Sequence, residues 1–164
     1  MSAALLVADS GPLIALARLD LLDLPARYFE SVLVPSTVWQ EVTRKPGVDE
    51  APRLSSAVDA RLIRVVADPQ TIPESLLRTS IDAGERGAIA LGIELNASLL
   101  MDDRRARLVA IELGRPVIGT LGLLLRGRED GLFSALRPLL ERLHATGYYL
   151  PGELVFEILS SLGE

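Results

Sequence analysis

Short apolar segments, each followed by a segment with helical spacing, recur from one end of this sequence to the other. The apolar segments predict strands at residues 4–9, 31–35, 62–66, 97–101 and 116–119. Apolar spacing predicts helices at 10–22, 36–44, 51–60, 81–96, 103–114 and 120–129. Strands that are apolar on both faces belong in a parallel sheet covered by helices on both sides. The expected fold class is therefore α/β, a three-layer α/β/α sandwich with a central parallel sheet.

The length of the chain fits one domain of this kind. Its 164 residues allow one sizeable core and are too few for two ordinary domains. The last part of the sequence predicts two further helices, separated at Gly147, with Pro151 opening the second. We expect a single domain over 1–164, in which 134–164 form a C-terminal helical extension.

Composition limits the chemistry that the chain can perform. The absence of cysteine excludes disulfides, thiolate metal sites and a cysteine nucleophile. A formal net charge of −5 argues against a protein that coats nucleic acid by electrostatic attraction alone. The sequence shows no signal-peptide pattern, and no apolar run approaches the ~18 residues of a membrane span. We therefore expect a cytoplasmic location.

Three aspartates lie where predicted strands end. Asp9 ends the first strand, and Asp102 and Asp103 end the strand at 97–101. The carboxyl ends of parallel strands share one rim of the sheet, where open α/β folds bind their ligands. A structural role is also open for these residues, because Asp9 and Asp102 could cap the helices that follow them.

Three further acids lie on helices near the same rim. Glu41 lies in the helix after the second strand, and Asp82 and Glu85 begin the long helix at 81–96. Residues three apart share a helical face, so Asp82 and Glu85 can point at one region. Alternatively, this pair only complements the positive end of the helix dipole, and Glu41 is a surface residue.

Acids from four segments that gather in one cleft need a cation to offset their repulsion. Oxygen ligands without histidine or cysteine favour Mg²⁺ or Mn²⁺. Such ions activate water and stabilise the charge that develops on a phosphate during in-line displacement. The expected chemistry is phosphodiester hydrolysis.

Four ordered stretches carry a resemblance to a known family. They are "VADSGPLIAL", "VLVPSTVWQEV", "DAGERGAIALGIELNASLLMDDRRAR" and "VIGTLGLLLR". Together they resemble the PIN-domain superfamily, in particular its compact prokaryotic branch related to VapC-type toxins. The resemblance covers approximately residues 4–130. Its most specific parts are the Asp-Ser-x-Pro-Leu-Ile opening and the Asp-Asp-Arg-Arg-Ala-Arg segment.

The resemblance implies a Mg²⁺-dependent ribonuclease that is selective for single-stranded RNA. Motif by motif, it places the catalytic and metal-binding acids on Asp9, Glu41, Glu85 and Asp103. The third acid is commonly aspartate in the family, so Asp82 is an alternative to Glu85, and Asp102 is an alternative to Asp103. The resemblance also implies a small antitoxin protein as partner and a homodimer.

Several neighbouring residues have more than one possible role. Ser10 and Thr120 follow strands and could hold a metal-bound water or a phosphate, or else cap helices. Arg104, Arg105 and Arg107 could contact RNA, bind the acidic tail of a partner protein, or form a solvated helix face. Tyr148 and Tyr149 in the C-terminal extension could stack on bases or pack the final helix.

Three functional hypotheses follow. The first is a metal-dependent RNA endonuclease that acts as the toxin of a toxin–antitoxin pair. The second is a catalytically degenerate PIN-like module that binds RNA or protein. The third is an α/β phosphatase that forms an aspartyl-phosphate at Asp9; it ranks last because such chemistry usually needs a nearby lysine, and Lys45 lies in an expected loop.

Overall fold

A computed structural model describes residues 4–44 and 49–164 of the chain. The five strands form one sheet in the order β3-β2-β1-β4-β5. They are β1 (Leu5–Ala8), β2 (Ser31–Pro35), β3 (Arg64–Val66), β4 (Ser98–Leu100) and β5 (Val117–Ile118). All neighbouring pairs are parallel. The predicted α/β/α fold with a central parallel sheet is confirmed.

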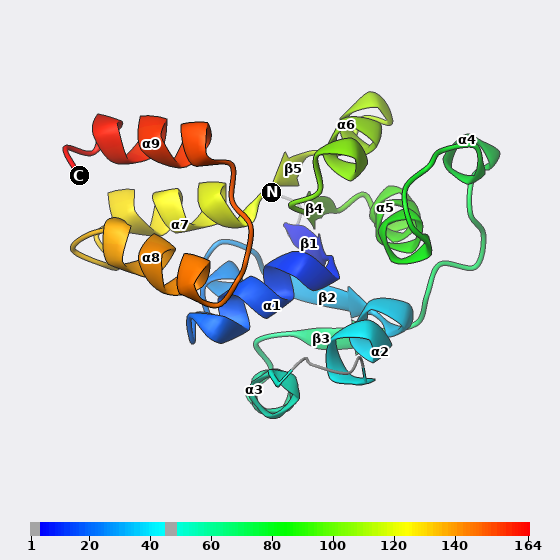
Figure 1. Ribbon diagram of the computed structural model, residues 1–164. Helices are drawn as coiled ribbons and strands as arrows, with labels where there is room; N and C mark the ends of the chain where they lie inside the picture. Colours follow the sequence, from blue (N-terminus) through cyan, green and yellow to red (C-terminus); the bar gives the residue numbers. More distant parts are fainter. Residues whose placement is uncertain (1–3, 45–48) are drawn as a thin grey trace.

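Helices connect successive strands and cover both faces of the sheet (Figure 1). The connecting helices are α1 (Ser10–Arg18), α2 (Ser36–Arg44), α3 (Ala51–Asp59), α4 (Glu74–Leu77), α5 (Ala83–Leu95) and α6 (Arg104–Glu112). After β5 come α7 (Thr120–Glu129), α8 (Arg137–Ala145) and α9 (Gly152–Ser161), and a short 3-10 turn spans Pro25–Arg27.

Alternation along the strands builds two separate cores. In β1, Leu6 and Ala8 face one core together with residues of α1, α3, α7 and α8. Val7 faces the other core, which α5 and α6 cover. A period of two sends successive side chains to opposite faces of a strand, and all three residues are fully buried. This two-sided burial explains why β1 is apolar throughout.

The C-terminal helices form one group on the side of α1 (yellow to red in Figure 1). The side chain of Glu164 holds them together, because it accepts hydrogen bonds from the backbone N–H groups of Leu136 and Arg137 and from Arg128 Nε. Gly147 adopts a φ of +85°, and Pro151 precedes α9. These two residues bound the segment that returns from α8 toward the sheet.

The elements differ from the expectations mainly at their ends. The first helix ends at Arg18 rather than near residue 22, because the chain turns at Asp20, which has a φ of +57°. The short helix α4 lies between the predicted strand at 62–66 and the predicted helix at 81–96, where no helix is predicted. Residues 45–48 of the expected loop at 45–52, with Lys45, lie outside the described residues.

Within the part of the chain that the structure describes, no helix is long and apolar enough to cross a membrane.

Candidate active site

A pocket of about 280 Å³ opens at the carboxyl ends of β1 and β4. We refer to it as the acid pocket. Its lining residues are Asp9, Ser10, Gly11, Pro12, Asp82, Glu85, Asp102, Asp103, Tyr148 and Tyr149. Four predicted acids and two tyrosines from distant parts of the sequence therefore share one cavity with Asp9. The position is the one where parallel α/β sheets bind their ligands.

Asp9 is the buried acid of the pocket, with 6% of its surface exposed. It precedes α1, and its backbone N–H donates to the carbonyl oxygen of Leu100 in β4. Burial raises the pKa of its carboxyl group to about 7, and the nearby charges of Glu85, Asp82 and Glu41 act in the same direction. A hydrogen bond from the Ser10 backbone partly opposes this rise. The fold thus keeps an acid where its charged form is unfavourable.

Glu41 reaches the site region from α2 through a gap at Gly84. A Cβ atom on Gly84 would lie 2.6 Å from Glu41 Oε1 and 3.1 Å from Oε2. Glycine is therefore the residue that lets the start of α5 come this close to the carboxylate. Glu41 does not line the acid pocket itself, but its charge raises the pKa values of Asp9 and Glu85.

Asp82 and Glu85 form a capping box at the start of α5. Asp82 Oδ1 accepts from the Glu85 backbone N–H at 2.8 Å, and Glu85 Oε2 accepts from the Asp82 backbone N–H at 3.0 Å. Asp82 and Glu85 therefore cap α5, which is a structural role for this pair. Desolvation also raises the pKa of Glu85, and the charges of Asp82, Asp103 and Glu41 add to this effect. The same residues thus begin a helix and face the other acids.

The adjacent Asp102 and Asp103 have different partners. Asp102 Oδ1 accepts from the Thr120 backbone N–H at 2.7 Å, and Oδ2 accepts from the Thr120 hydroxyl at 2.6 Å and from the Tyr148 hydroxyl. Asp103 is exposed and caps α6, where its Oδ1 accepts from the Ala106 backbone N–H at 2.9 Å. Asp102 is thus committed to protein groups, whereas Asp103 keeps one carboxylate oxygen directed away from its cap.

Thr120, Tyr148 and Ser10 surround Asp9 and Asp102 in different ways. Thr120 is fully buried, and its hydroxyl serves Asp102. Desolvation raises the pKa of Tyr148, and the charge of Asp102 and the hydrogen bond to it act in the same sense. Ser10 is the first residue of α1 and lines the pocket. The contact between Tyr148 and Asp102 spans 46 positions, so no spacing in the sequence could have indicated it.

The three arginines after Asp103 lie on α6 in unlike environments. Arg104 is exposed, and Arg105 donates to the Ser80 hydroxyl at 2.6 Å. Arg107 donates to the Met101 carbonyl oxygen at 3.0 Å, and a Cβ atom on Gly119 would lie 2.5 Å from its Nη1. Arg107 therefore supports the turn after β4, whereas Arg104 and Arg105 lie at the surface.

The donor chemistry of the acid pocket fits a hard divalent cation, since every candidate ligand is a carboxylate. Among residues 4–44 and 49–164, however, no three acidic or histidine side chains lie close enough together to form a metal-binding group. The expectation that Asp9, Glu41 and Asp103 already meet at one point is thus not met. The charge of Glu41 contributes to the raised pKa of Asp9, and the charges of Glu41 and Asp103 contribute to the raised pKa of Glu85, so these acids lie around a common region.

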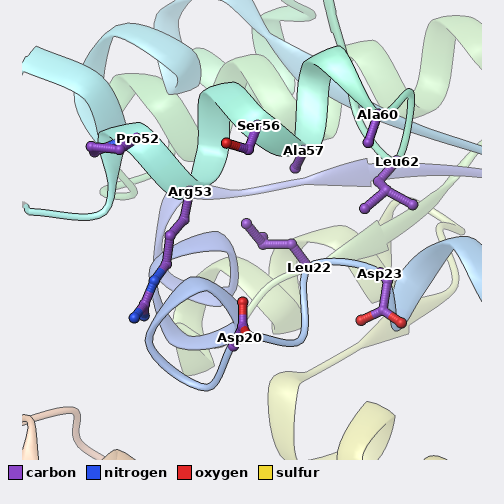
Figure 2. Close-up of a pocket in the computed structure, with 9 residues that line it drawn as sticks. All are labelled: Asp20, Leu22, Asp23, Pro52, Arg53, Ser56, Ala57, Ala60 and Leu62. Carbon is purple, nitrogen blue, oxygen red and sulfur yellow. The ribbon is translucent and has the colours of Figure 1, made fainter.

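A second, larger cavity lies between α3 and the turn after α1, and has a volume of about 470 Å³ (Figure 2). We refer to it as the α1–α3 pocket. It is lined by Asp20, Leu22, Asp23, Pro52, Arg53, Ser56, Ala57, Ala60 and Leu62. Arg53 donates to the carbonyl oxygen of Ala17 at 2.8 Å. None of the predicted site residues lines this pocket.

Comparisons with known proteins add family information to this geometry. A family model described as a PIN domain matches residues 5–164. A PilT N-terminus domain protein from the hyperthermophilic archaeon Sulfolobus solfataricus is 24% identical, with 73% of this chain and 89% of that chain covered and a TM-score of 0.56. PAE2754 from Pyrobaculum aerophilum is 18% identical, with coverages of 76% and 97% and a TM-score of 0.50. No curated relative matches the chain.

Proposed function

The chain belongs to the PIN-domain family, and from this membership we propose that it is a divalent-metal-dependent endonuclease that hydrolyses single-stranded RNA. PIN domains are generally nucleases, which supports a hydrolase at the coarse level. One observation carries the finer proposal: Asp9 is buried at the end of β1 among acids that raise the pKa of its carboxyl group. A bound cation would offset the unfavourable charge that the fold maintains there.

We propose that the metal is Mg²⁺ or Mn²⁺ and that its ligands are Asp9, Glu41, Asp103 and Glu85. When bound, the ion would supply Lewis-acid stabilisation of the phosphate and lower the pKa of a water molecule. Asp9, fixed by its backbone hydrogen bond to Leu100, would provide the rigid ligand. The Glu85 oxygen that does not hold the Asp82 amide would serve either as a metal ligand or to orient the attacking water.

A cleavage assay tests this assignment. We expect the wild-type protein to cut a labelled single-stranded RNA in Mg²⁺ and to leave it intact in EDTA. Asp9→Asn should reduce the cleavage rate about 100-fold or more, because it removes a charged ligand from the reacting centre. The control is Asp20→Asn, the same change in the α1–α3 pocket. Undiminished cleavage in EDTA would refute the metal mechanism, and undiminished cleavage by Asp9→Asn would refute the role of this residue.

We further propose that the chain acts in the cytoplasm as the toxin of a toxin–antitoxin pair. The support is a surface beside the acid pocket, where α6 exposes Leu108 and Ile111 together with Arg104. Mixed apolar and basic surface suits a small partner with apolar and acidic residues. Coexpression with a short neighbouring gene tests this role. We expect its product to copurify with the chain and to abolish RNA cleavage. Sedimentation of the purified chain tests the homodimer.

A catalytically degenerate PIN-like module that binds RNA or protein is the second candidate. The observation that favours it is that no three acids of the described chain form a metal-binding group. Thermal unfolding in increasing Mg²⁺ separates the two candidates. A nuclease site should raise the melting temperature with Mg²⁺, since an ion that binds only the folded state stabilises it. A degenerate module should show no such rise.

A further inference from the structure

The C-terminal extension contributes directly to the acid pocket. Tyr148 lies between Gly147 and the start of α9, and its hydroxyl donates to Asp102 Oδ2. A Cβ atom on Gly11 would lie 3.2 Å from the same hydroxyl oxygen, so the tyrosine also lies against the start of α1. One side chain thus ties the segment after α8 to the turn after β4 and to the first turn after β1.

The next residue, Tyr149, has a different environment. Tyr149 lines the acid pocket, yet 82% of its surface is exposed. Among the described residues, Tyr149 and Phe156 are the strongly exposed aromatic side chains, and of these two only Tyr149 lines the acid pocket. Tyr28 shows the ordinary arrangement, since its ring stacks under Arg126 and its hydroxyl donates to Asp130. The position of Tyr149 beside the acids therefore needs an explanation other than packing.

We propose that Tyr149 is a stacking platform for an unpaired base of single-stranded RNA, and that Tyr148 positions it. This rests on the proposed function, because it assumes that the acids hold the adjacent phosphate through a cation. An aromatic ring accepts any base through its π-face, which gives affinity for single strands with little sequence preference. A base in a duplex is already stacked and paired, so the same platform selects against double-stranded RNA.

The composition of the pocket favours a nucleobase over a protein partner. Contacts between proteins concentrate apolar residues around an aromatic anchor and deplete charged ones at the centre. Tyr149 instead shares its pocket with Asp9, Asp82, Asp102 and Asp103. A single aromatic ring beside carboxylates that suit a metal-bound phosphate matches the alternating base and phosphate groups of a nucleic acid strand.

Fluorescence of a short unstructured RNA that contains 2-aminopurine tests the platform. Stacking on the tyrosine should quench the fluorescence, and a titration in Mg²⁺ with a non-hydrolysable backbone analogue of this RNA gives the dissociation constant with the cation in place and without cleavage. Tyr149→Ala should weaken binding about tenfold and abolish the quench, whereas Tyr149→Phe should retain both. The matched control is Phe156→Ala, which removes a ring from α9 that is 72% exposed and does not line the pocket. Binding of the same RNA as a duplex should not depend on Tyr149.

A double-mutant cycle tests the positioning role of Tyr148. Tyr148→Phe keeps the ring and removes the hydroxyl that Asp102 accepts, so it should reduce the quench in the wild-type background. In the Tyr149→Ala background it should change RNA binding no further, because the platform is already absent. Equal losses in both backgrounds would overturn the positioning role.

The outcomes separate this inference from the nuclease proposal. If the wild type cleaves RNA in Mg²⁺ and Tyr149→Ala binds RNA as tightly as the wild type, the platform is refuted and the nuclease stands. If quenching depends on Tyr149 but no cleavage occurs in Mg²⁺, the platform stands and the nuclease is refuted. Unchanged RNA binding together with an altered sedimentation coefficient of Tyr149→Ala would overturn the platform in favour of a protein contact.

Discussion

The acid pocket and the α1–α3 pocket both contain carboxylates, but only one of them holds an acid at an energetic cost. The α1–α3 pocket is the larger, at about 470 Å³ against about 280 Å³. Its acid Asp20 is exposed and shares the cavity with Arg53. In the acid pocket, Asp9 is buried and surrounded by carboxylates that raise the pKa of its side chain.

In this structure, the larger cavity is therefore not the one that holds the candidate catalytic acids. A buried carboxylate among like charges persists only where the surrounding structure holds it in place, and such perturbed groups gather at functional sites. The sheet supplies this rigidity, since Asp9 directly follows β1 and its own backbone N–H donates to the carbonyl oxygen of Leu100 in β4. The α1–α3 pocket contains no buried carboxylate among its described residues, and it therefore supplies control positions.

The largest expected effect concerns the pH dependence of stability without metal. The pKa of Asp9 is about 7 in the folded protein against 3.8 for the ordinary group. Between these values the folded state binds a proton that the unfolded state releases, so stability falls as pH rises. At about 1.4 kcal/mol per pH unit, the free energy of unfolding falls by about 4 kcal/mol from pH 4 to 7. Urea unfolding in EDTA should show that Asp9→Asn gains stability over the wild type by this amount across the window.

The control for this comparison is Asp20→Asn, which should follow the wild-type pH dependence throughout. Asn also tolerates the positive φ of position 20, so the substitution introduces no backbone strain. Addition of Mg²⁺ should shrink the difference between Asp9→Asn and the wild type. A constant difference from pH 4 to 7 would mean that Asp9 is charged at little cost and that the two pockets do not differ as described.

The next effect concerns the gap that admits Glu41. Gly84→Ala would place a methyl group 2.6 Å from Glu41 Oε1, and the flexible carboxylate would have to move. We expect Mg²⁺-dependent RNA cleavage to fall about tenfold to 100-fold, because small displacements of catalytic groups are costly. Gly87→Ala is the matched control on the same helix, since no atom lies within 4 Å of its new Cβ. Equal cleavage by both variants would show that Glu41 does not take part in the reaction.

A smaller effect concerns the hydrogen bonds that occupy Asp102. Thr120→Val removes a fully buried hydroxyl that donates to Asp102, and the unfolding free energy should fall by about 1–3 kcal/mol. The same arrangement recurs at an exposed position, where Thr37 donates to Asp68 through both its backbone N–H and its hydroxyl. Thr37→Val should therefore cost less than about 1 kcal/mol, because water replaces the lost partner. Equal losses in urea unfolding would contradict the burial argument.

The smallest effect concerns the surface arginines of α6. If Arg104 and Arg105 contact phosphates, changing both to glutamine should reduce the salt dependence of RNA binding by a slope of about 1.4, at about 0.7 per contact. Arg53→Gln in the α1–α3 pocket should leave the slope unchanged. Fluorescence titrations at several salt concentrations measure both slopes, and an unaltered slope in the double variant would place the RNA elsewhere.

The strands could be predicted from the sequence because each one is a short apolar run, which is a local pattern. Alternating strands and helices predict a parallel sheet, and the parallel pairing of β1 with β4 brings Asp9 and Asp103 to one rim. The choice between Asp102 and Asp103 could not be made in this way. It depends on Thr120, at the start of a later helix, and on Tyr148, 46 positions along the chain. The approach of Glu41 to Gly84 is equally long-range, so only the structure reveals it.

The capping box of α5 explains why a glutamate, rather than the shorter aspartate, is present at position 85. One of its oxygens holds the Asp82 amide, an attachment for which glutamate or glutamine is the usual residue at this helical position. In the proposed nuclease site, Glu85 would therefore offer a cation only its second carboxylate oxygen, because the first is bound to the start of α5. The added methylene allows one side chain to cap the helix and, in the proposed site, to bind a cation, so we expect ion binding to reduce fraying at this end of α5.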